Sequence, residues 1–371
     1  MPASDSSATA APAAGIIRGN TKARILIEDF TGSTGQTTQD AVTDSLERTG
    51  DFLFGPGASS FVISAICSGG RIQGSVKDPA GKLLFSANYD NLNLRINAHQ
   101  FADEIVSAIF GRTGVATTQI AFVSDASGHR EIYMCDADGA DIRQITSDKS
   151  ACVSPSLRND ALFLAFTSYV SGYPDLYLID LGTGTRRRIA NAPGTNSGAA
   201  FSPDGERLAM TMSFSGNPEL YVTNEGGLGG RRLTNTPWAE SSPAWAPDGT
   251  RLVFAANPTG KPQLYVQPLA GGKPLLLQTG SAHCTEPSWS PDGYRIAFTV
   301  RQGRRLMVAI LNTTTGSTRI LTEGMDPCWG ADGRHLVYAQ NEYLIVHNVD
   351  SGAKRIIVSH MGRLSEPSWS H

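Results

Sequence analysis

The sequence predicts a mainly β protein: a six-bladed β-propeller closed by its C-terminal strand and preceded by a small α/β domain. A turn of the form Pro-Asp-Gly recurs after short strands that often contain Trp, as in residues 287–293. The turn aspartates are evenly spaced, with successive gaps of 44, 44, 44 and 40 residues; they are Asp160, Asp204, Asp248, Asp292 and Asp332. A fixed period in this range indicates an array of similar supersecondary units.

Each repeat has the content of one blade. Pro presets φ and Gly supplies a positive φ, so Pro-Asp-Gly is expected to form a turn between two strands. An alternating strand follows, such as residues 295–299, then a strand of the Leu-Tyr-Val type, such as residues 264–266. A short last strand ends in Leu-Thr, as at residues 321–322. Four strands in a repeat of about 44 residues are typical of a propeller blade.

The two ends of the repeat array are complementary. The first repeat, residues 119–146, has three strands and lacks the strand with the Pro-x-Trp pattern, whereas residues 366–370 at the chain end supply only that strand. We therefore expect the C-terminal strand to become the innermost strand of blade 1, which closes the ring and removes exposed strand edges. An open array with frayed ends is the alternative.

The region before the repeats predicts a small α/β domain. Its expected strands are residues 23–30, 61–66, 72–76 and 83–87, with a hairpin turn at residues 78–81. One helix is expected at about residues 37–49, with Thr37 as its N-cap and Gly50 after its end. A second helix is expected at about residues 98–110, where apolar residues form a wide face and Gly111 ends it.

We place three segments along the chain. Residues 1–20 are expected to be a disordered segment rich in Ala, Ser and Pro. Residues 21–114 are assigned to the α/β domain and residues 115–371 to the propeller. Residues 1–14 lack the basic and strongly apolar regions of a signal peptide, so we expect none in this chain.

Composition excludes several classes of protein. The net charge is −3 and no long basic run is present, so a nucleic-acid partner is not expected. No apolar run reaches the ~18–20 residues of a membrane span. The five cysteines are scattered and form no Cys-x-x-Cys pair, which argues against a disulfide framework or a zinc site.

No catalytic motif is evident. The seven histidines are far apart, and neither His-Glu-x-x-His nor Gly-x-Ser-x-Gly occurs. The repeated aspartates are expected to form turns. The tryptophans at one repeat position are expected to pack between blades; they are Trp245, Trp289, Trp329 and Trp369. We therefore predict that the chain is not an enzyme.

One set of acidic residues is not required by packing. Glu286, Asp326 and Glu366 precede the expected innermost strands of three neighbouring blades, so they should lie near one mouth of the central channel. Like charges at close range raise one another's pKa unless a cation offsets them, and carboxylate oxygens suit Ca²⁺. A bound cation and a hydrated acidic rim are the two interpretations.

With these features the chain resembles the TolB family, the periplasmic propeller proteins of the Tol-Pal system. The resemblance covers about residues 20–371 and includes the Pro-x-Trp-Ser-Pro-Asp-Gly, Leu-Ala-Phe and Leu-Tyr-Val repeats. The α/β domain placed before the repeats and the terminal Glu-Pro-Ser-Trp-Ser also match.

The resemblance implies a non-catalytic binding scaffold of the cell envelope. In that family the peptidoglycan-associated lipoprotein Pal docks over one channel mouth, the N-terminal segment contacts TolA, and the channel can hold Ca²⁺. Partner-binding residues are then expected in the loops before the innermost strands: Thr195, Asn196, Gly198, Ser241 and Ser242, together with Glu286, Asp326 and Glu366. The family can carry His where this chain has Thr195, and Glu where it has Ser242.

Two other interpretations remain. A propeller-based enzyme would be a peptidase, which needs a separate hydrolase domain, or a polysaccharide lyase, which needs clustered His or Asp ligands. A surface propeller with an unrelated protein partner is the other. A pull-down against a Pal-type lipoprotein separates this last interpretation from the TolB-like scaffold.

Overall fold

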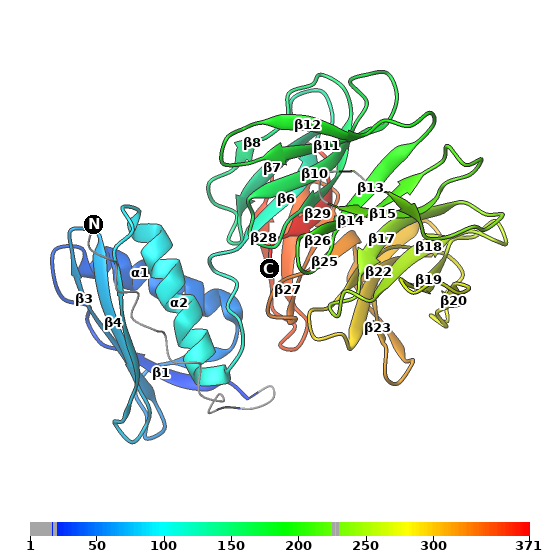
Figure 1. Ribbon diagram of the computed structural model, residues 1–371. Helices are drawn as coiled ribbons and strands as arrows, with labels where there is room; N and C mark the ends of the chain where they lie inside the picture. The colour runs from blue at the N-terminus through cyan, green and yellow to red at the C-terminus, as the bar shows by residue number, and fades with distance from the viewer. Residues whose placement is uncertain (1–16, 18–20, 225–226, 228–229) are drawn as a thin grey trace. The chain divides into compact units, whose positions relative to one another are not determined.

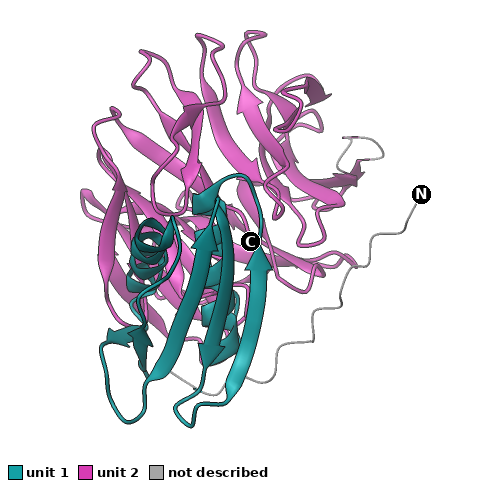
Figure 2. Cartoon of the chain, turned by 90° about the vertical axis from the view of Figure 1, so that its left-hand side faces the viewer, with its two compact units in different colours: residues 1–117 teal, residues 118–371 magenta. Residues whose placement is uncertain are grey.

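The computed structural model describes residues 17, 21–224, 227 and 230–371, which divide into two compact units, residues 1–117 and 118–371 (Figures 1 and 2). We describe each unit by itself. The predicted disordered segment, residues 1–20, lies outside the described residues except for Ile17.

The first unit is a five-stranded sheet with two helices. Its elements are β1 (Ala23–Ile27), α1 (Gly35–Thr49), β2 (Phe52–Phe54), β3 (Phe61–Ser68), β4 (Arg71–Lys77), β5 (Leu83–Tyr89) and α2 (Leu94–Phe110). The strand order is β2-β1-β3-β4-β5, with β1 parallel to β2 and β3 and the other pairs antiparallel. Ile25, Leu46, Ile63 and Phe101 are fully buried in one apolar core between the sheet and the helices.

The predicted helix ends are partly confirmed. Gly50 and Gly111 follow the two helices in the left-handed conformation, as expected. The predicted N-cap Thr37 is wrong, because α1 already begins at Gly35. A Cβ at Gly35 would lie 2.1 Å from the carbonyl oxygen of Phe30, so only glycine fits at this start. Helix α2 begins earlier than predicted because Asn93 caps it, accepting from the N–H of Arg95 at 2.9 Å.

The second unit is a ring of six four-stranded blades (Figure 1). From the innermost strand outward, blade 1 contains β29 (Leu364–Trp369), β6 (Gln119–Ser124), β7 (Glu131–Asp136) and β8 (Arg143–Gln144). Blade 2 contains β9 (Cys152–Leu157), β10 (Phe163–Ser168), β11 (Asp175–Asp180) and β12 (Arg186–Ala190). Blade 3 contains β13 (Asn196–Phe201), β14 (Arg207–Met212), β15 (Glu219–Asn224) and β16 (Arg231–Arg232).

The other three blades repeat the pattern. Blade 4 contains β17 (Glu240–Trp245), β18 (Arg251–Ala256), β19 (Gln263–Pro268) and β20 (Leu275–Leu276). Blade 5 contains β21 (Cys284–Trp289), β22 (Arg295–Gln302), β23 (Arg305–Asn312) and β24 (Thr318–Glu323). Blade 6 contains β25 (Met325–Trp329), β26 (His335–Gln340), β27 (Tyr343–Asn348) and β28 (Lys354–Val358).

The chain end closes the ring as predicted. Strand β29 pairs antiparallel with β6, so that Leu364 faces Ser124 and Trp369 faces Ile120. The fold class expected from the sequence is therefore confirmed: a six-bladed propeller completed by its last strand, with a small α/β domain before it.

The repeated Asp and Trp residues have the expected structural roles. Asp292 accepts from the N–H of Tyr294 at 2.9 Å within the turn, as a turn former does. It also binds Arg295 at 2.7 Å, and that guanidinium lies 4.8 Å from the ring centre of the buried Trp329 in the next blade. Arg207 and Arg251 make the same contacts with Trp245 and Trp289, so one pattern joins four successive blades.

Candidate functional site at the channel mouth

Every innermost strand contains one residue with a left-handed backbone. These residues are Ser154, Gly198, Ser242, Glu286, Asp326 and Glu366, with φ values of 51°, 62°, 53°, 47°, 54° and 53°. In five of the six strands the next residue is Pro, which has no N–H for the strand ladder. The ladder shifts register at this point, for example between Thr285 and Ser288. Each innermost strand therefore carries a β-bulge at the same position.

The bulges correct one detail of the sequence interpretation. Glu286, Asp326 and Glu366 were expected just before the innermost strands. They lie within them instead, since β21 begins at Cys284, β25 at Met325 and β29 at Leu364. The Pro-x-Trp pattern predicts only the part of each innermost strand that follows the bulge. It gives no indication of the two or so strand residues that precede the bulge.

The bulges surround a pocket of about 370 Å³ in the channel. Three consecutive residues of each innermost strand line it, beginning with the left-handed residue. The pocket thus brings together five of the residues singled out from the sequence: Gly198, Ser242, Glu286, Asp326 and Glu366. Ser154 also lines the pocket, although it was not among the predicted site residues.

The other three predicted residues do not line this pocket. Asn196 is fully buried, and its amide donates to the carbonyl oxygens of Ala192 and Pro174 at 2.7 and 3.3 Å. This side chain holds the loop before β13 and is not presented to a partner. Thr195 is half-buried and Ser241 is exposed, and neither residue lines the pocket.

Glu366 is held by its own blade and by both neighbouring blades. Its carboxylate accepts from Arg130 Nη2 at 2.5 Å and from the hydroxyl of Ser154 at 3.2 Å. The N–H of Glu366 in turn donates to Asp326 Oδ2 at 2.9 Å. Sequence reasoning missed Arg130, because it lies in the β6–β7 connection of blade 1 and meets Glu366 only after the ring has closed.

Asp326 and Glu286 form the unneutralised part of the mouth. Burial raises the pKa of Asp326 well above its usual range, and the charge of Glu286 raises it further. The charge of Glu366 acts in the same direction, whereas the hydrogen bond from the N–H of Glu366 opposes the rise. The mouth therefore holds two carboxyl groups whose repulsion a cationic group would relieve.

The donor set only partly fits the predicted cation. Within residues 17, 21–224, 227 and 230–371 no group of three His, Cys, Asp or Glu side chains is arranged to hold a metal ion. Glu366, the third carboxylate expected in the site, is paired with Arg130 instead. If Ca²⁺ binds in the channel, Glu286 and Asp326 are the two carboxylates that would hold it. Binding of Ca²⁺ stays a prediction.

The serine between Pro and Trp also has a role that the sequence did not reveal. Ser288 Oγ accepts from the N–H of Trp329 at 3.2 Å, and Ser368 Oγ accepts from the N–H of Leu157 at 2.9 Å. Each bond joins the innermost strand of one blade to that of the next. These bonds tie neighbouring innermost strands together, including across the closing strand, whereas Ala200 and Ala244 occupy the same position in blades 3 and 4.

All five cysteines are unpaired; Cys67, Cys135, Cys152 and Cys284 are buried and Cys328 is half-buried. Among the described residues, no helix has both the length and the apolar character needed to cross a membrane.

The closed ring and its bulged, partly acidic channel define the class of protein: a six-bladed β-propeller with an N-terminal α/β domain. Residues 106–371 match the family described as the TolB beta propeller domain. Because that match covers most of the sequence, the chain belongs to the TolB propeller family.

Individual relatives agree with this assignment. The chain is 34% identical over 114 residues to a protein named "Protein TolB homolog" from Chlorobium chlorochromatii, covering 29% of this chain and 26% of the relative. It is 34% identical over 118 residues to "Tol-Pal system protein TolB" from Geobacter metallireducens, covering 29% of this chain and 28% of the relative. The matched segments thus span about a quarter of the length of these curated relatives.

The solved structure of TolB from Acinetobacter baumannii is similar over both units. The TM-score is 0.82 at 26% sequence identity, with 94% of this chain and 97% of that chain covered.

Proposed function

We propose that the chain is a periplasmic, non-catalytic scaffold of the Tol-Pal system that docks a Pal-type lipoprotein over the channel mouth. The observation that carries the proposal is the ring of six bulges around one pocket. The similarity of this chain to Acinetobacter TolB, which extends over 97% of that chain, supports the same role.

The electrostatics of the mouth support a partner with a cationic side chain. Arg130 neutralises Glu366, whereas Glu286 and Asp326 face one another, and within the described residues neither forms an ion pair with a basic side chain. A Lys or Arg side chain inserted between these two carboxyl groups would lower the cost of their repulsion. Such complementarity sets the orientation and the association rate of a docked protein.

Calorimetry with the soluble domain of a Pal-type lipoprotein tests the proposal. We expect saturable binding to the full chain, weakened at least about tenfold, roughly 1.4 kcal/mol, in Asp326→Asn and in Glu286→Gln. Glu206→Gln is the matched control, since Glu206 is exposed in the turn after β13, at the other end of that strand. Absence of binding at high micromolar concentration would favour an unrelated partner and overturn the proposal.

A second contact, with TolA through residues 1–20, is proposed separately because those residues lie outside the described part except for Ile17. A pull-down of the soluble part of TolA with the full chain and with a chain lacking residues 2–16 tests it. Equal capture by both forms would exclude the N-terminal segment as the contact, without affecting the channel-mouth proposal.

A further inference from the structure

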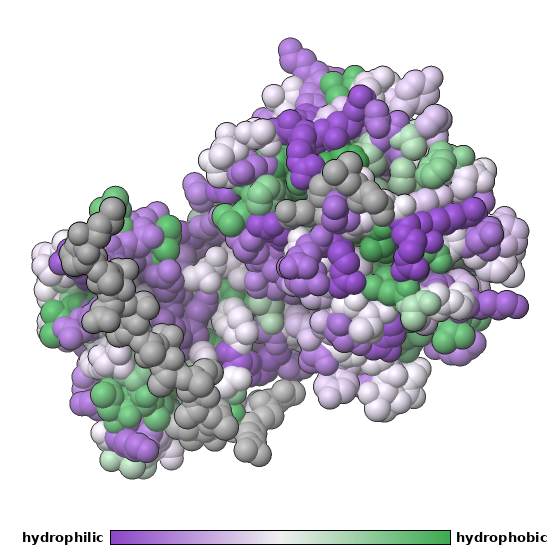
Figure 3. Space-filling view, viewed as in Figure 1, coloured by the Kyte–Doolittle hydropathy of each residue, from purple (hydrophilic) through white to green (hydrophobic). Residues whose placement is uncertain are grey.

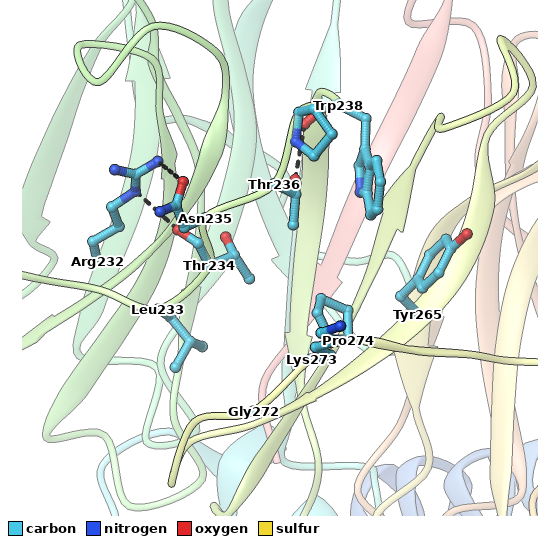
Figure 4. A pocket seen from close by; sticks show the side chains of 11 residues that line it. Arg232, Leu233, Thr234, Asn235, Thr236, Trp238, Tyr265, Gly272, Lys273 and Pro274 are labelled. Carbon is cyan, nitrogen blue, oxygen red and sulfur yellow. Dashed lines mark hydrogen bonds between the residues drawn. The ribbon is translucent and has the colours of Figure 1, made fainter.

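A second pocket, of about 500 Å³, lies between blades 3 and 4 (Figure 4). It is lined by residues 232–238, which connect the outermost strand of blade 3 to the innermost strand of blade 4, and by Tyr265 and residues 272–274 of blade 4. It shares no lining residue with the channel pocket. Its volume falls in the range of about 300–1,000 Å³ that is typical of ligand sites.

Trp238 and Tyr265 form an aromatic wall of this pocket (Figure 4). Their rings are stacked, with centroids 6.5 Å apart and an interplanar angle of 30°. Tyr265 belongs to the repeat, because Tyr133, Tyr177 and Tyr221 occupy the same position in blades 1 to 3. Trp238 is the residue that distinguishes this blade.

The propeller repeat does not require Trp238. It lies two residues before β17, and the residues two before β9, β13 and β21 are Ser150, Gly194 and Ala282. Three other blades therefore accept a small residue at this position. Trp238 packs against the apolar core of blades 3 and 4, and its half-buried side chain also lines the pocket.

The loop that carries Trp238 is pre-organised. The amide of Asn217 donates to the carbonyl oxygens of Trp238 and Thr236 at 2.8 and 3.0 Å. The N–H of Thr236 donates to the buried Glu219 at 3.0 Å, and its hydroxyl donates to the buried Glu240 at 2.8 Å. A loop fixed in this way loses little entropy when a ligand binds.

The outer strand beside the pocket also departs from the repeat. The residue paired with the repeat tyrosine is Gln144, Arg188 and Arg232 in blades 1 to 3, but Leu276 in blade 4. Leu275 and Leu276 are 63% and 44% exposed. The surface seen in Figure 3 is mostly polar, with apolar residues in small separate groups. Leu275 and Leu276 thus add exposed apolar surface directly after Pro274 of the pocket wall.

The wall of the pocket carries two basic side chains, while the buried carboxylates of Glu219 and Glu240 lie behind it. Lys273 lies on its wall and is exposed, and Arg232 lines the opposite side (Figure 4). Glu219 neutralises Arg232, and no carboxylate lines the pocket. Lys273 therefore supplies a charge that suits an acidic group on the ligand.

The polar side chains around the pocket are already paired with one another. The hydroxyls of Thr234 and Thr236 both donate to Glu240, and Asn235 accepts from Arg232 at 2.9 Å. A sugar, which needs partners for many hydroxyls, would find few of them here. The indole Nε1 of Trp238 is buried and has no acceptor among the described residues, so the part of this side chain that a ligand can contact is its ring.

From these features we propose that the pocket binds a proline-containing, acidic peptide segment of a partner protein. Proline-rich segments are extended and lose little entropy on docking into aromatic-lined grooves, where ring faces contact the proline side chains. Trp238 and Tyr265 supply the faces, and Lys273 pairs with an acidic side chain. Leu275 and Leu276 extend the contact along β20.

Peptide display on the full chain tests the proposal. A library of short random peptides is first depleted of peptides that bind a Trp238→Ser variant. Serine is chosen because Ser150 occupies the matching position in the repeat. The remaining peptides are then selected on the unmodified chain. We expect enrichment of peptides with proline beside Asp or Glu. No enrichment over the starting library, or enrichment of basic or proline-free peptides, would overturn the proposal.

Affinities of the most enriched peptide then identify the contacts. Fluorescence anisotropy should show binding at least about tenfold weaker in Trp238→Ser and in Lys273→Glu. Lys261→Glu is the matched control, an exposed lysine of the same blade outside the pocket, and it should leave the affinity unchanged. Equal affinity in Trp238→Ser, or displacement of the peptide by a chitin oligosaccharide, would overturn the peptide assignment. Circular dichroism melts of all variants exclude misfolding as the cause.

Discussion

The indole Nε1 of Trp369 donates a hydrogen bond to the hydroxyl of Thr118 at 2.7 Å, and these two residues are 251 positions apart. Thr118 is the first residue of the propeller unit and Trp369 ends its last strand. The same junction contains the bond from the N–H of Ser370 to the carbonyl oxygen of Gln119 at 2.9 Å. The ring is therefore closed by hydrogen bonds and by a buried aromatic side chain.

Deletion of residues 365–371 should abolish cooperative melting of the propeller. The deletion exposes the edge of β6 and removes Trp369 from its buried site, where only 3% of its surface is exposed. Calorimetry and circular dichroism measure the transition. Thr118→Val, which removes only the hydroxyl bond, should cost about 1 kcal/mol and remain cooperative. A deleted chain that melts like the intact one would show that β29 does not close the ring.

Asp332 should make the stability of blade 6 depend on pH. Burial alone would raise the pKa of Asp332, but the charge of His335 and hydrogen bonds from His335 and two backbone N–H groups hold that pKa well below its usual range. The folded pKa thus lies below the unfolded value of about 3.9. The stabilisation of the folded chain by the Asp332 carboxylate is therefore complete at pH values above the unfolded pKa. It is lost as the pH falls toward the folded pKa.

Asp332→Asn should therefore destabilise the chain by about 3 kcal/mol at pH 7, and the difference from wild type should shrink below about pH 4. Unfolding curves recorded across this pH range measure both effects. Asp248→Asn is the control, because the pair of Asp248 with Arg251 is 46% and 45% exposed and should contribute less than about 1 kcal/mol. A pH-independent difference between Asp332→Asn and wild type would contradict the role assigned to the carboxylate.

The periodic features of the sequence were sufficient to predict the blades. The spacing of Asp204, Asp248 and Asp292 reflects a backbone requirement, since each turn needs the same residues, and the incomplete first repeat required a strand from the chain end. The bulges were not predicted. The left-handed positions are occupied by Ser, Gly, Glu and Asp, so they share no residue type that would mark the conformation in the sequence.

Contacts that depend on closure of the ring were equally hidden. Arg130 and Glu366 meet only because the ring closes, so no local pattern relates them. Thr195 and Asn196 were selected for their place before an innermost strand, yet the amide of Asn196 serves the loop itself. Trp238, in contrast, could have been recognised from the sequence, since aligning the repeats shows Ser150, Gly194 and Ala282 at the same position.

Calcium titration tests the predicted cation. If Ca²⁺ binds between Glu286 and Asp326, calorimetry should detect heat at or below millimolar Ca²⁺, and Glu286→Gln should abolish it. Glu366→Gln should reduce it less, because Glu366 is already paired with Arg130. Asp326→Asn should raise the melting temperature in the presence of a chelator, since it removes a buried carboxyl repelled by its neighbours. Absence of heat at millimolar Ca²⁺, or heat unchanged in Glu286→Gln, would exclude the site.

Arg295 should stabilise the junction between blades 5 and 6. Its guanidinium lies 4.8 Å from the ring centre of Trp329, donates to Asp292 at 2.7 Å and reaches the carbonyl oxygen of Gly333 at 2.5 Å. Arg295→Met keeps most of the apolar stem but removes the cation and both donors, so it should cost about 1–2 kcal/mol. Urea unfolding measures the loss.

Arg305→Met is the matched control for this substitution. Arg305 is exposed at the start of β23 in the same blade, so its replacement should change the free energy of unfolding by less than about 0.5 kcal/mol. If the Arg295 and Arg305 variants unfold at the same urea concentration, the cation over Trp329 contributes nothing to the interface. In that case burial of Trp329 and the bond from its N–H to Ser288 Oγ hold the two blades together without the cation, and Arg207 and Arg251 should prove equally dispensable at their own junctions.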